Sequence, residues 1–68
     1  MDKEIGRIKK NETIEIVVKV DDFGGNIGVT IREFVKSDTY TGFTKQGTRI
    51  LKTQWDDFKK ILEQVNFD

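Results

Sequence analysis

The pattern that most constrains the fold is an alternation of apolar and polar side chains in the first half of the chain. Apolar β-branched residues occupy every second position in segment 13–20 and again in segment 27–31. A period of two is typical of strands with one buried face, and β-branched residues favour strands. The intervening segment 21–26 holds Gly24-Gly25, a pair that accepts the positive φ of a tight turn. The sequence therefore predicts an antiparallel hairpin, in which Gly28 marks a bulge or a close approach of another group.

The rest of the chain predicts two further strands and one helix. Strands are expected at Ile5–Lys10 and Phe43–Ile50, and the polar residues 1–4 are expected to be disordered. Thr53 is a candidate helix N-cap, with Asp56 in the capping-box position. A helix over 54–66 is predicted by an apolar stripe at helical spacing, formed by Trp55, Phe58, Ile61, Leu62 and Val65. Residues 1–68 thus form one α+β domain, with the strands between residues 5 and 50.

A chain of 68 residues without cysteine or histidine has few ways to reinforce a small core. Disulfides are impossible, and the carboxylates lack the spacing of a calcium-binding loop. Oligomerisation is the remaining support, and we expect a homodimer.

The sequence also predicts where the protein resides. No run approaches the roughly 20 apolar residues of a membrane span, and segment 1–12 is too charged for a signal peptide. We expect an intracellular protein without a membrane partner, in the cytoplasm or nucleoid, or in the host cell if it is phage-encoded.

The chain offers no recognisable catalytic arrangement. Without His or Cys, and with no serine at motif spacing from a basic partner, the usual nucleophile–base pairs are missing. The glycines match neither the P-loop nor the dinucleotide pattern. Asp21-Asp22 and Asp56-Asp57 fit a turn and a helix N-terminus, which favours a structural explanation over acid–base or metal chemistry. We expect no enzymatic activity, no cofactor, no metal and no small-molecule substrate.

Charge is distributed unevenly, although the net charge of the whole chain is zero. Segment 23–54 carries five cations and two anions, a local net charge of +3. Tyr40 and Phe43 lie among these cations in a polar, glycine-bearing stretch where a ring is hard to bury. Cations contact phosphates and exposed rings stack on bases, so this combination favours binding of an unpaired nucleic-acid strand.

Several short elements occur in a specific order and spacing: Ile16-Val17-Val18-Lys19-Val20, Phe23 with Gly25, Ile31-Arg32-Glu33-Phe34, Thr44-Lys45-Gln46-Gly47, and Trp55 with its helix. In these elements the segment 14–65 resembles the single-stranded-DNA-binding domain of the transcriptional coactivator positive cofactor four family, including its small bacterial and phage members. The resemblance implies four strongly curved antiparallel strands and a C-terminal helix. It also implies a homodimer joined largely through the helices, which binds single-stranded DNA with weak sequence preference and regulates transcription.

The resemblance and the local charge together define the candidate residues. Carried over by position, the DNA face comprises Phe23, Asn26, Arg32, Val35, Lys45, Gln46 and Gly47. The pattern of cations and rings adds Lys36, Tyr40, Phe43 and Arg49. The dimer interface is expected at Trp55, Phe58, Leu62 and Val65, although Trp55 also suits the core of one chain. For Arg32 the alternative is a solvated strand face on which it pairs with Glu33 or Asp22, and for Phe34 we favour the core.

Departures from the family pattern predict weaker and less salt-dependent binding. Gly24, Asn26 and Gln46 stand where the family often has a basic residue, Val35 where it often has an aromatic one, and Phe43 where a proline is usual. Fewer cations release fewer counterions, and Phe43 could supply the stacking ring that Val35 lacks. Two alternatives stay open, the first because basic positions are missing and the second because no feature obviously reads a 2′-hydroxyl. The chain could be a protein–protein adaptor that keeps the dimer scaffold with little DNA affinity, or it could bind RNA.

Overall fold

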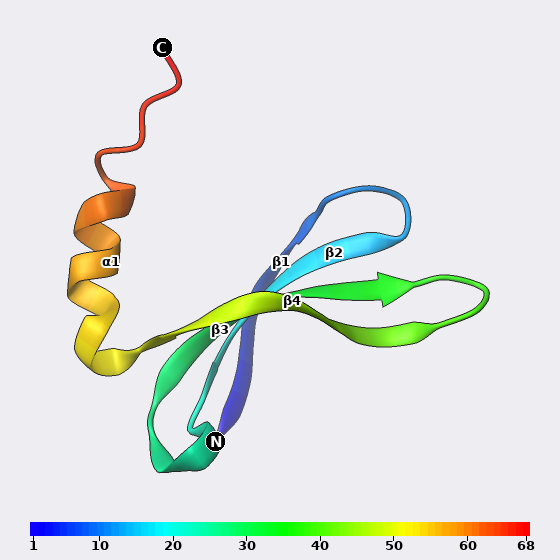
Figure 1. Cartoon of the computed structure of the whole chain (residues 1–68), viewed down its shortest axis with the longest axis horizontal. Helices are drawn as coiled ribbons and strands as arrows, with labels where there is room; N and C mark the ends of the chain where they lie inside the picture. Colours follow the sequence, from blue (N-terminus) through cyan, green and yellow to red (C-terminus); the bar gives the residue numbers. More distant parts are fainter.

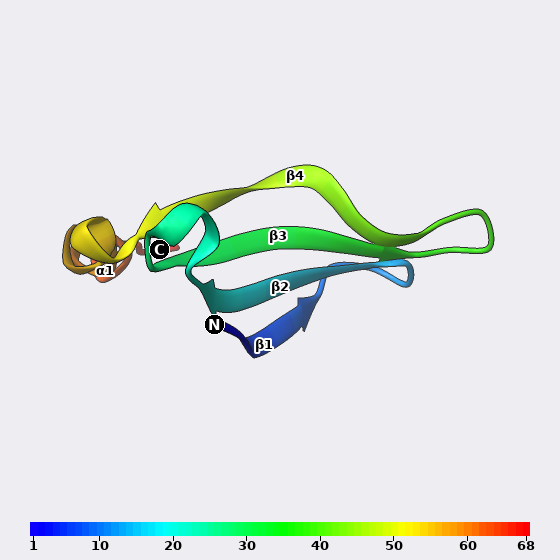
Figure 2. The ribbon, with the colours of Figure 1, turned by 90° about the horizontal axis from the view of Figure 1, so that it is seen from below.

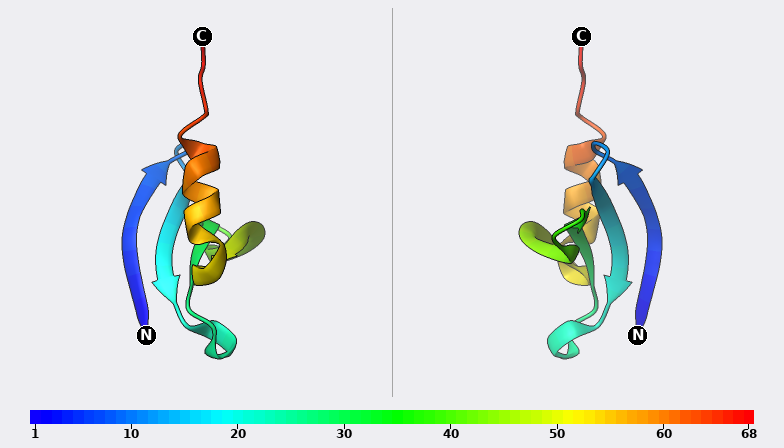
Figure 3. Two further views of the ribbon diagram at one scale, coloured as in Figure 1. Left: turned by 90° about the vertical axis from the view of Figure 1, so that its left-hand side faces the viewer. Right: turned by 90° about the vertical axis from the view of Figure 1, so that its right-hand side faces the viewer.

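The computed structural model describes all 68 residues, and its four strands form one antiparallel sheet in the order β1-β2-β3-β4 (Figure 1). The strands are β1 (Asp2–Lys9), β2 (Ile14–Asp21), β3 (Gly28–Lys36) and β4 (Thr41–Leu51). The 3₁₀ turns η1 (Phe23–Gly25) and η2 (Lys52–Gln54) follow β2 and β4, and the helix α1 (Trp55–Leu62) comes last. The predicted α+β arrangement, an antiparallel sheet followed by one helix, is confirmed, and the strands are visibly curved (Figure 3).

The N-terminal residues join the sheet, so the prediction that residues 1–4 are disordered is wrong. Asp2 pairs with Asp21, and Glu4 pairs with Lys19 of β2. An ion pair between Asp2 Oδ2 and Lys19 Nζ, 3.4 Å apart, accompanies this pairing. The first residues of β1 carry charged side chains rather than an apolar alternation, and a hydrophobic pattern therefore did not reveal them.

The helix is shorter than predicted and begins differently. α1 ends at Leu62 rather than at residue 66, and the N–H groups of Gln64 and Val65 donate only to carbonyls three residues back. The predicted capping box is wrong because Thr53 lies inside η2, the turn that carries the chain out of β4. Gln54 precedes α1 instead, and its Oε1 accepts a hydrogen bond from the Leu51 backbone N–H at 3.2 Å.

The strand register divides the sheet into two faces of different chemistry. Residues directly opposite each other in an antiparallel pair point to the same face. One face, here called the polar face, carries Arg7, Lys19, Asp21, Thr30, Arg32, Phe34, Phe43, Gly47 and Arg49. The other, the apolar face, carries Ile8, Ile14, Ile16, Val18, Val20, Val29, Ile31, Val35 and Ile50. The alternation that predicted the hairpin of β2 and β3 therefore matches the observed register.

The packing of a single chain is thin. Val17, 1% exposed, is the only buried apolar side chain, and it lies on the polar face between its cross-strand neighbours Arg7 and Arg32. The aliphatic stems of such long side chains can cover an apolar neighbour. The apolar face has no second layer, because α1 leaves the end of the sheet and packs mainly on η2 and β4 (Figure 2).

Candidate nucleic-acid interface

Five residues singled out from the sequence line one hollow on the polar face. The hollow has a volume of about 510 Å³. Phe23 reaches it from η1, Arg32 from β3, and three more from β4, namely Lys45, Gly47 and Arg49. The remaining lining residues are Met1, Asp2, Lys19, Asp21, Asp22, Thr30 and Thr48. A site scattered over 27 positions of sequence, from 23 to 49, is thus assembled by the β3–β4 pairing and the turn after β2.

Arg32 is a fixed cation without a carboxylate partner. Its Nε donates to the carbonyl oxygen of Thr44 at 2.8 Å, and its guanidinium carbon lies 5.9 Å from the centroid of the Phe43 ring. The alternative pairing with Glu33 does not occur, because Glu33 faces away and accepts from Lys10 Nζ at 2.8 Å. One nitrogen of Arg32 is thus held by the backbone, while the exposed end of the guanidinium stays available to an anion.

Gly47 explains how Arg32 can lie so close to β4. A Cβ added at Gly47 would stand 2.6 Å from the Ile31 carbonyl oxygen and 2.8 Å from Arg32 Cγ. Contacts this short require a shift of backbone. The glycine is therefore needed sterically, since it leaves room for the stem of Arg32.

A bulge in β4 presents Lys45. The register passes from Arg32↔Gly47 directly to Phe34↔Phe43, which leaves residues 44–46 of β4 without cross-strand partners. The Gln46 backbone N–H donates to Thr44 Oγ1 at 3.0 Å and closes the bulge. Bulges commonly re-aim a side chain beside a functional site. Lys45 and Gln46 are both exposed here, and Lys45 forms no ion pair within the chain.

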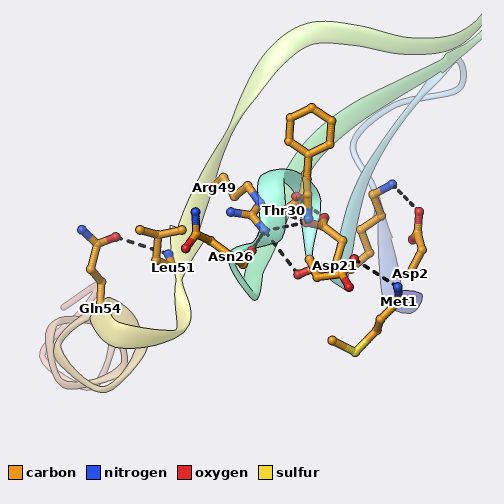
Figure 4. Close-up of polar contacts among 11 residues, drawn as sticks. Met1, Asp2, Asp21, Asn26, Thr30, Arg49, Leu51 and Gln54 are labelled. Carbon is orange, nitrogen blue, oxygen red and sulfur yellow. Dashed lines mark hydrogen bonds and ion pairs between the residues drawn. The ribbon is translucent and has the colours of Figure 1, made fainter.

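Arg49 lines the hollow but is committed to a carboxylate (Figure 4). Its Nε and Nη2 donate to Asp21 Oδ1 at 2.9 and 2.7 Å, and Nη2 also donates to the carbonyl oxygen of Asn26. Thr30 Oγ1 donates to the other oxygen, Asp21 Oδ2, at 2.6 Å. The hydrogen bonds from Thr30 and then from Arg49 lower the pKa of Asp21 to about 2 against the cost of its burial. Unlike Arg32 and Lys45, Arg49 is therefore not a free cation, and Asn26 acts here through its backbone.

The aromatic residues fall into two groups. Phe23 is 80% exposed, and its ring stands bare at the edge of the hollow. Phe34 and Phe43 are half-buried and meet edge to face, with ring centroids 5.2 Å apart. Phe34 was expected in the core and instead lies on the polar face, where Arg7 covers it at 4.9 Å from its centroid. Phe23 is the only aromatic residue that lines the hollow, and it is exposed.

Three other candidates lie away from the hollow. Val35 is on the apolar face opposite Ile14, whereas Arg32, three residues earlier in the same strand, is on the polar face. Lys36 is exposed at the far end of β3. Tyr40 belongs to the β3–β4 hairpin, where its hydroxyl donates to the Phe43 carbonyl oxygen at 2.7 Å, and it is half-exposed. A period of two sends Val35 to the other side of the sheet from Arg32, so the structure does not bring these two candidates together.

Lys19 also lines the hollow, although it was not among the residues predicted from the sequence. Its Nζ lies 5.2 Å from the centroid of the Phe43 ring and 3.4 Å from Asp2 Oδ2. The signal that could have found it is strand parity, because Lys19 and Arg32 share a face once β2 and β3 are placed in register. Arg7 of the edge strand β1 is also on the polar face, but it is paired with two carboxylates. Its Nε lies 2.8 Å from Glu4 Oε2, and its Nη1 lies 3.1 Å from Glu15 Oε1. The hydrogen bond from Arg7 lowers the pKa of Glu4.

No group of three or more acidic side chains is arranged to hold a metal ion, and none of the helices has the length and apolarity to cross a bilayer. A scan against protein-family models, a search of curated proteins and a search of solved structures each found no match to this chain.

Proposed function

We propose that the protein is a homodimeric single-stranded-DNA-binding protein with weak sequence preference. The observation that carries the proposal is the convergence of Phe23, Arg32 and Lys45 on one hollow of the polar face. Two free cations and a bare ring in one place are what an unpaired strand needs, since cations bind its phosphates and rings stack on its bases. Each base stacked on an aromatic ring contributes about 1–3 kcal/mol. A duplex hides its base faces inside the stack and offers nothing to Phe23.

Weak sequence preference follows from the kind of contacts available. Phosphate contacts carry no direct sequence information, and every base has a face that can stack. A role in transcription regulation of the coactivator type is supported by the resemblance of segment 14–65 to the positive cofactor four family.

Dimerisation is supported by the surface that one chain leaves uncovered. The accessible surface is 5633 Å², whereas a compact monomer of this mass exposes about 4,400 Å². The excess of about 1,200 Å² per chain is what one partner of an obligate dimer typically buries. Part of this exposed surface is apolar and lies on the C-terminal helix and the residues just after it. Ile61, Leu62 and Val65 there are 64%, 48% and 54% exposed. We propose that a second copy of the chain buries this surface, with the apolar stripes of the two helices packed against each other.

A second candidate function is a protein–protein adaptor. It is favoured by the carboxylates that already neutralise Arg7, Lys19 and Arg49 on the polar face. Of these three cations, Lys19 and Arg49 line the hollow, so their carboxylate partners reduce its positive charge, which would weaken DNA binding.

A fluorescence-anisotropy titration of a labelled unpaired oligonucleotide separates the two functions. We expect salt-sensitive binding that an unlabelled duplex of the same sequence competes poorly, and a matched RNA strand serves as a second competitor. The double variant Arg32→Ala with Lys45→Ala should lose most of the affinity at low salt. Wild-type protein that does not bind even at low salt would favour the adaptor, and an unaffected double variant would rule out this site.

A further inference from the structure

Two cations lie close to the ring of Phe43. Lys19 Nζ from β2 and the Arg32 guanidinium from β3 lie 5.2 and 5.9 Å from its centroid, and the ring of Phe34 meets it edge to face. A cation within about 6 Å of a ring centroid is attracted to the negative face of the ring. Three strands thus contribute to one cluster, which we call the Phe43 cluster: Lys19, Arg32 and Phe43.

We infer that the Phe43 cluster is a phosphate-binding site, in which Lys19 and Arg32 contact the sugar–phosphate backbone and Phe43 is a positioning residue for both cations. This inference rests on the proposed function, because it names how the strand would be held at the hollow that Lys19 and Arg32 line. It differs from the expectation that Phe43 stacks on a base. It also adds Lys19 to the contacts and leaves stacking to Phe23.

The two cations of the cluster are available to a phosphate in different ways. Arg32 uses Nε for the Thr44 carbonyl and has no carboxylate partner. Lys19 pairs with Asp2, but the N–O distance is 3.4 Å and the Asp2 side chain is 66% exposed. Exposed ion pairs of this kind contribute little and are screened by salt. A phosphate can therefore replace Asp2 at Lys19, whereas the buried pair of Arg49 with Asp21 is held by the additional hydrogen bonds from Thr30 and to Asn26.

A ring that positions cations and a ring that stacks on bases give different signatures. Loss of a phosphate contact reduces the steepness of the salt dependence, by about 0.7 in log K against log salt for each contact with a single strand. Loss of a stacking contact lowers affinity and leaves that slope unchanged, and it has no effect on a strand without bases.

The test compares Phe43→Leu, Phe43→Tyr and Phe23→Leu on two labelled probes of equal length, an unpaired DNA strand and an abasic strand of the same backbone. We expect Phe43→Leu to lower affinity about three- to tenfold on both probes. Its salt slope should become shallower by about 0.7 to 1.4 per protomer. Phe43→Tyr keeps the ring and should behave as wild type. Phe23→Leu should weaken only the base-bearing probe, with its slope unchanged.

Lys19→Met tests the cluster without touching the ring. It should make the slope shallower by about 0.7 per protomer, and its effect should be smaller in a Phe43→Leu background, because the ring and the lysine act together. Thermal unfolding of each variant checks that the fold is intact. The inference is overturned if Phe43→Leu behaves as Phe23→Leu does, or if Lys19→Met leaves the slope unchanged. Wild-type protein that binds neither probe would remove the proposed function itself, which is a different result from either of these.

Discussion

The guanidinium of Arg49 donates two hydrogen bonds to a single carboxylate oxygen of Asp21, at 2.9 and 2.7 Å, and so joins β4 to the end of β2. β3 lies between these strands, and its Thr30 donates to the other Asp21 oxygen at 2.6 Å. Gly28 of β3 provides the space, since a Cβ there would lie 3.0 Å from Arg49 Cζ. One buried carboxylate, 7% exposed, therefore ties three of the four strands together at the end of the sheet from which α1 departs (Figure 4).

Acid should weaken this connection. The folded protein lowers the pKa of Asp21 from 3.8 to about 2, so the stabilisation is present above pH 4 and is lost as pH falls from about 4 to about 2. We expect Asp21→Asn to lower the free energy of unfolding by on the order of 2 kcal/mol at pH 7. The deficit relative to wild type should shrink as the pH approaches 2. Urea unfolding followed by circular dichroism at several pH values measures both.

Asp38→Asn is the matched control for this prediction. Asp38 is exposed and belongs to no ion pair. It should leave the unfolding free energy within about 0.5 kcal/mol of wild type. Equal effects of the two substitutions would mean that general charge, rather than the Asp21 connection, sets the pH dependence.

Gly47→Ala should affect both stability and binding. The added Cβ would lie 2.6 Å from the Ile31 carbonyl and 2.8 Å from Arg32 Cγ, so the β3–β4 pair must separate locally and Arg32 must move. We expect a loss of about 1–3 kcal/mol in the free energy of unfolding and weaker binding of unpaired DNA. Gly6→Ala in β1 is the control, because an added Cβ there meets nothing within 4 Å. A Gly47→Ala protein as stable as Gly6→Ala would contradict the close packing of Gly47 against Ile31 and Arg32.

The strands and the helix that follows them were predictable from the sequence, because two-residue periodicity, glycine-bearing turns and helical spacing of apolar residues are local signals. The first strand was predicted too short, since residues 2–4 pair with β2 through the backbone while their charged side chains show no apolar alternation. The site was predictable in part. Arg32, Lys45, Gly47 and Phe23 do come together in one hollow. Strand parity alone predicts that Val35 and Arg32 lie on opposite faces of the sheet.

Other features could not be predicted from the sequence, because they depend on contacts between segments that are far apart in the chain. Nothing in the order of residues pairs Arg49 with Asp21, 28 positions away, rather than with a phosphate. The bulge at residues 44–46 and the cations over Phe43 are likewise set by tertiary packing. The sequence therefore identifies a cation more easily than its partner. Whether the cation is paired with a carboxylate or available to a phosphate depends on the tertiary structure.

Lys45 and Arg49 should separate binding from stability, although both line the hollow. Lys45 is unpaired on the bulge, so Lys45→Ala should leave the melting temperature within a few degrees of wild type. The same variant should make the salt slope of DNA binding shallower by about 0.7 per protomer. Arg49→Ala should lower the melting temperature clearly, since it leaves a buried carboxylate without its main partner. Differential scanning fluorimetry and salt-dependent anisotropy on the same samples test this, and identical behaviour of the two variants would contradict it.

The exposed apolar stripe of the helical segment gives the last prediction. Leu62 is 48% exposed and Ile61 64% exposed in one chain, so a charge at Leu62 costs little unless a partner covers it. We expect Leu62→Glu to convert a dimer into a monomer in size-exclusion chromatography with light scattering, because an unpaired charge would be buried at the interface. Gln64→Glu introduces the same charge at an exposed polar position of the same segment and should remain dimeric. A monomeric wild type, or dissociation of both variants alike, would contradict the assignment of the dimer interface to the helix stripe.

A monomeric but folded Leu62→Glu protein would also show whether one hollow alone binds a DNA strand. Since two linked hollows on one strand bind more tightly than either does singly, its affinity for a long oligonucleotide should fall well below that of the dimer, while its affinity for a short one changes little.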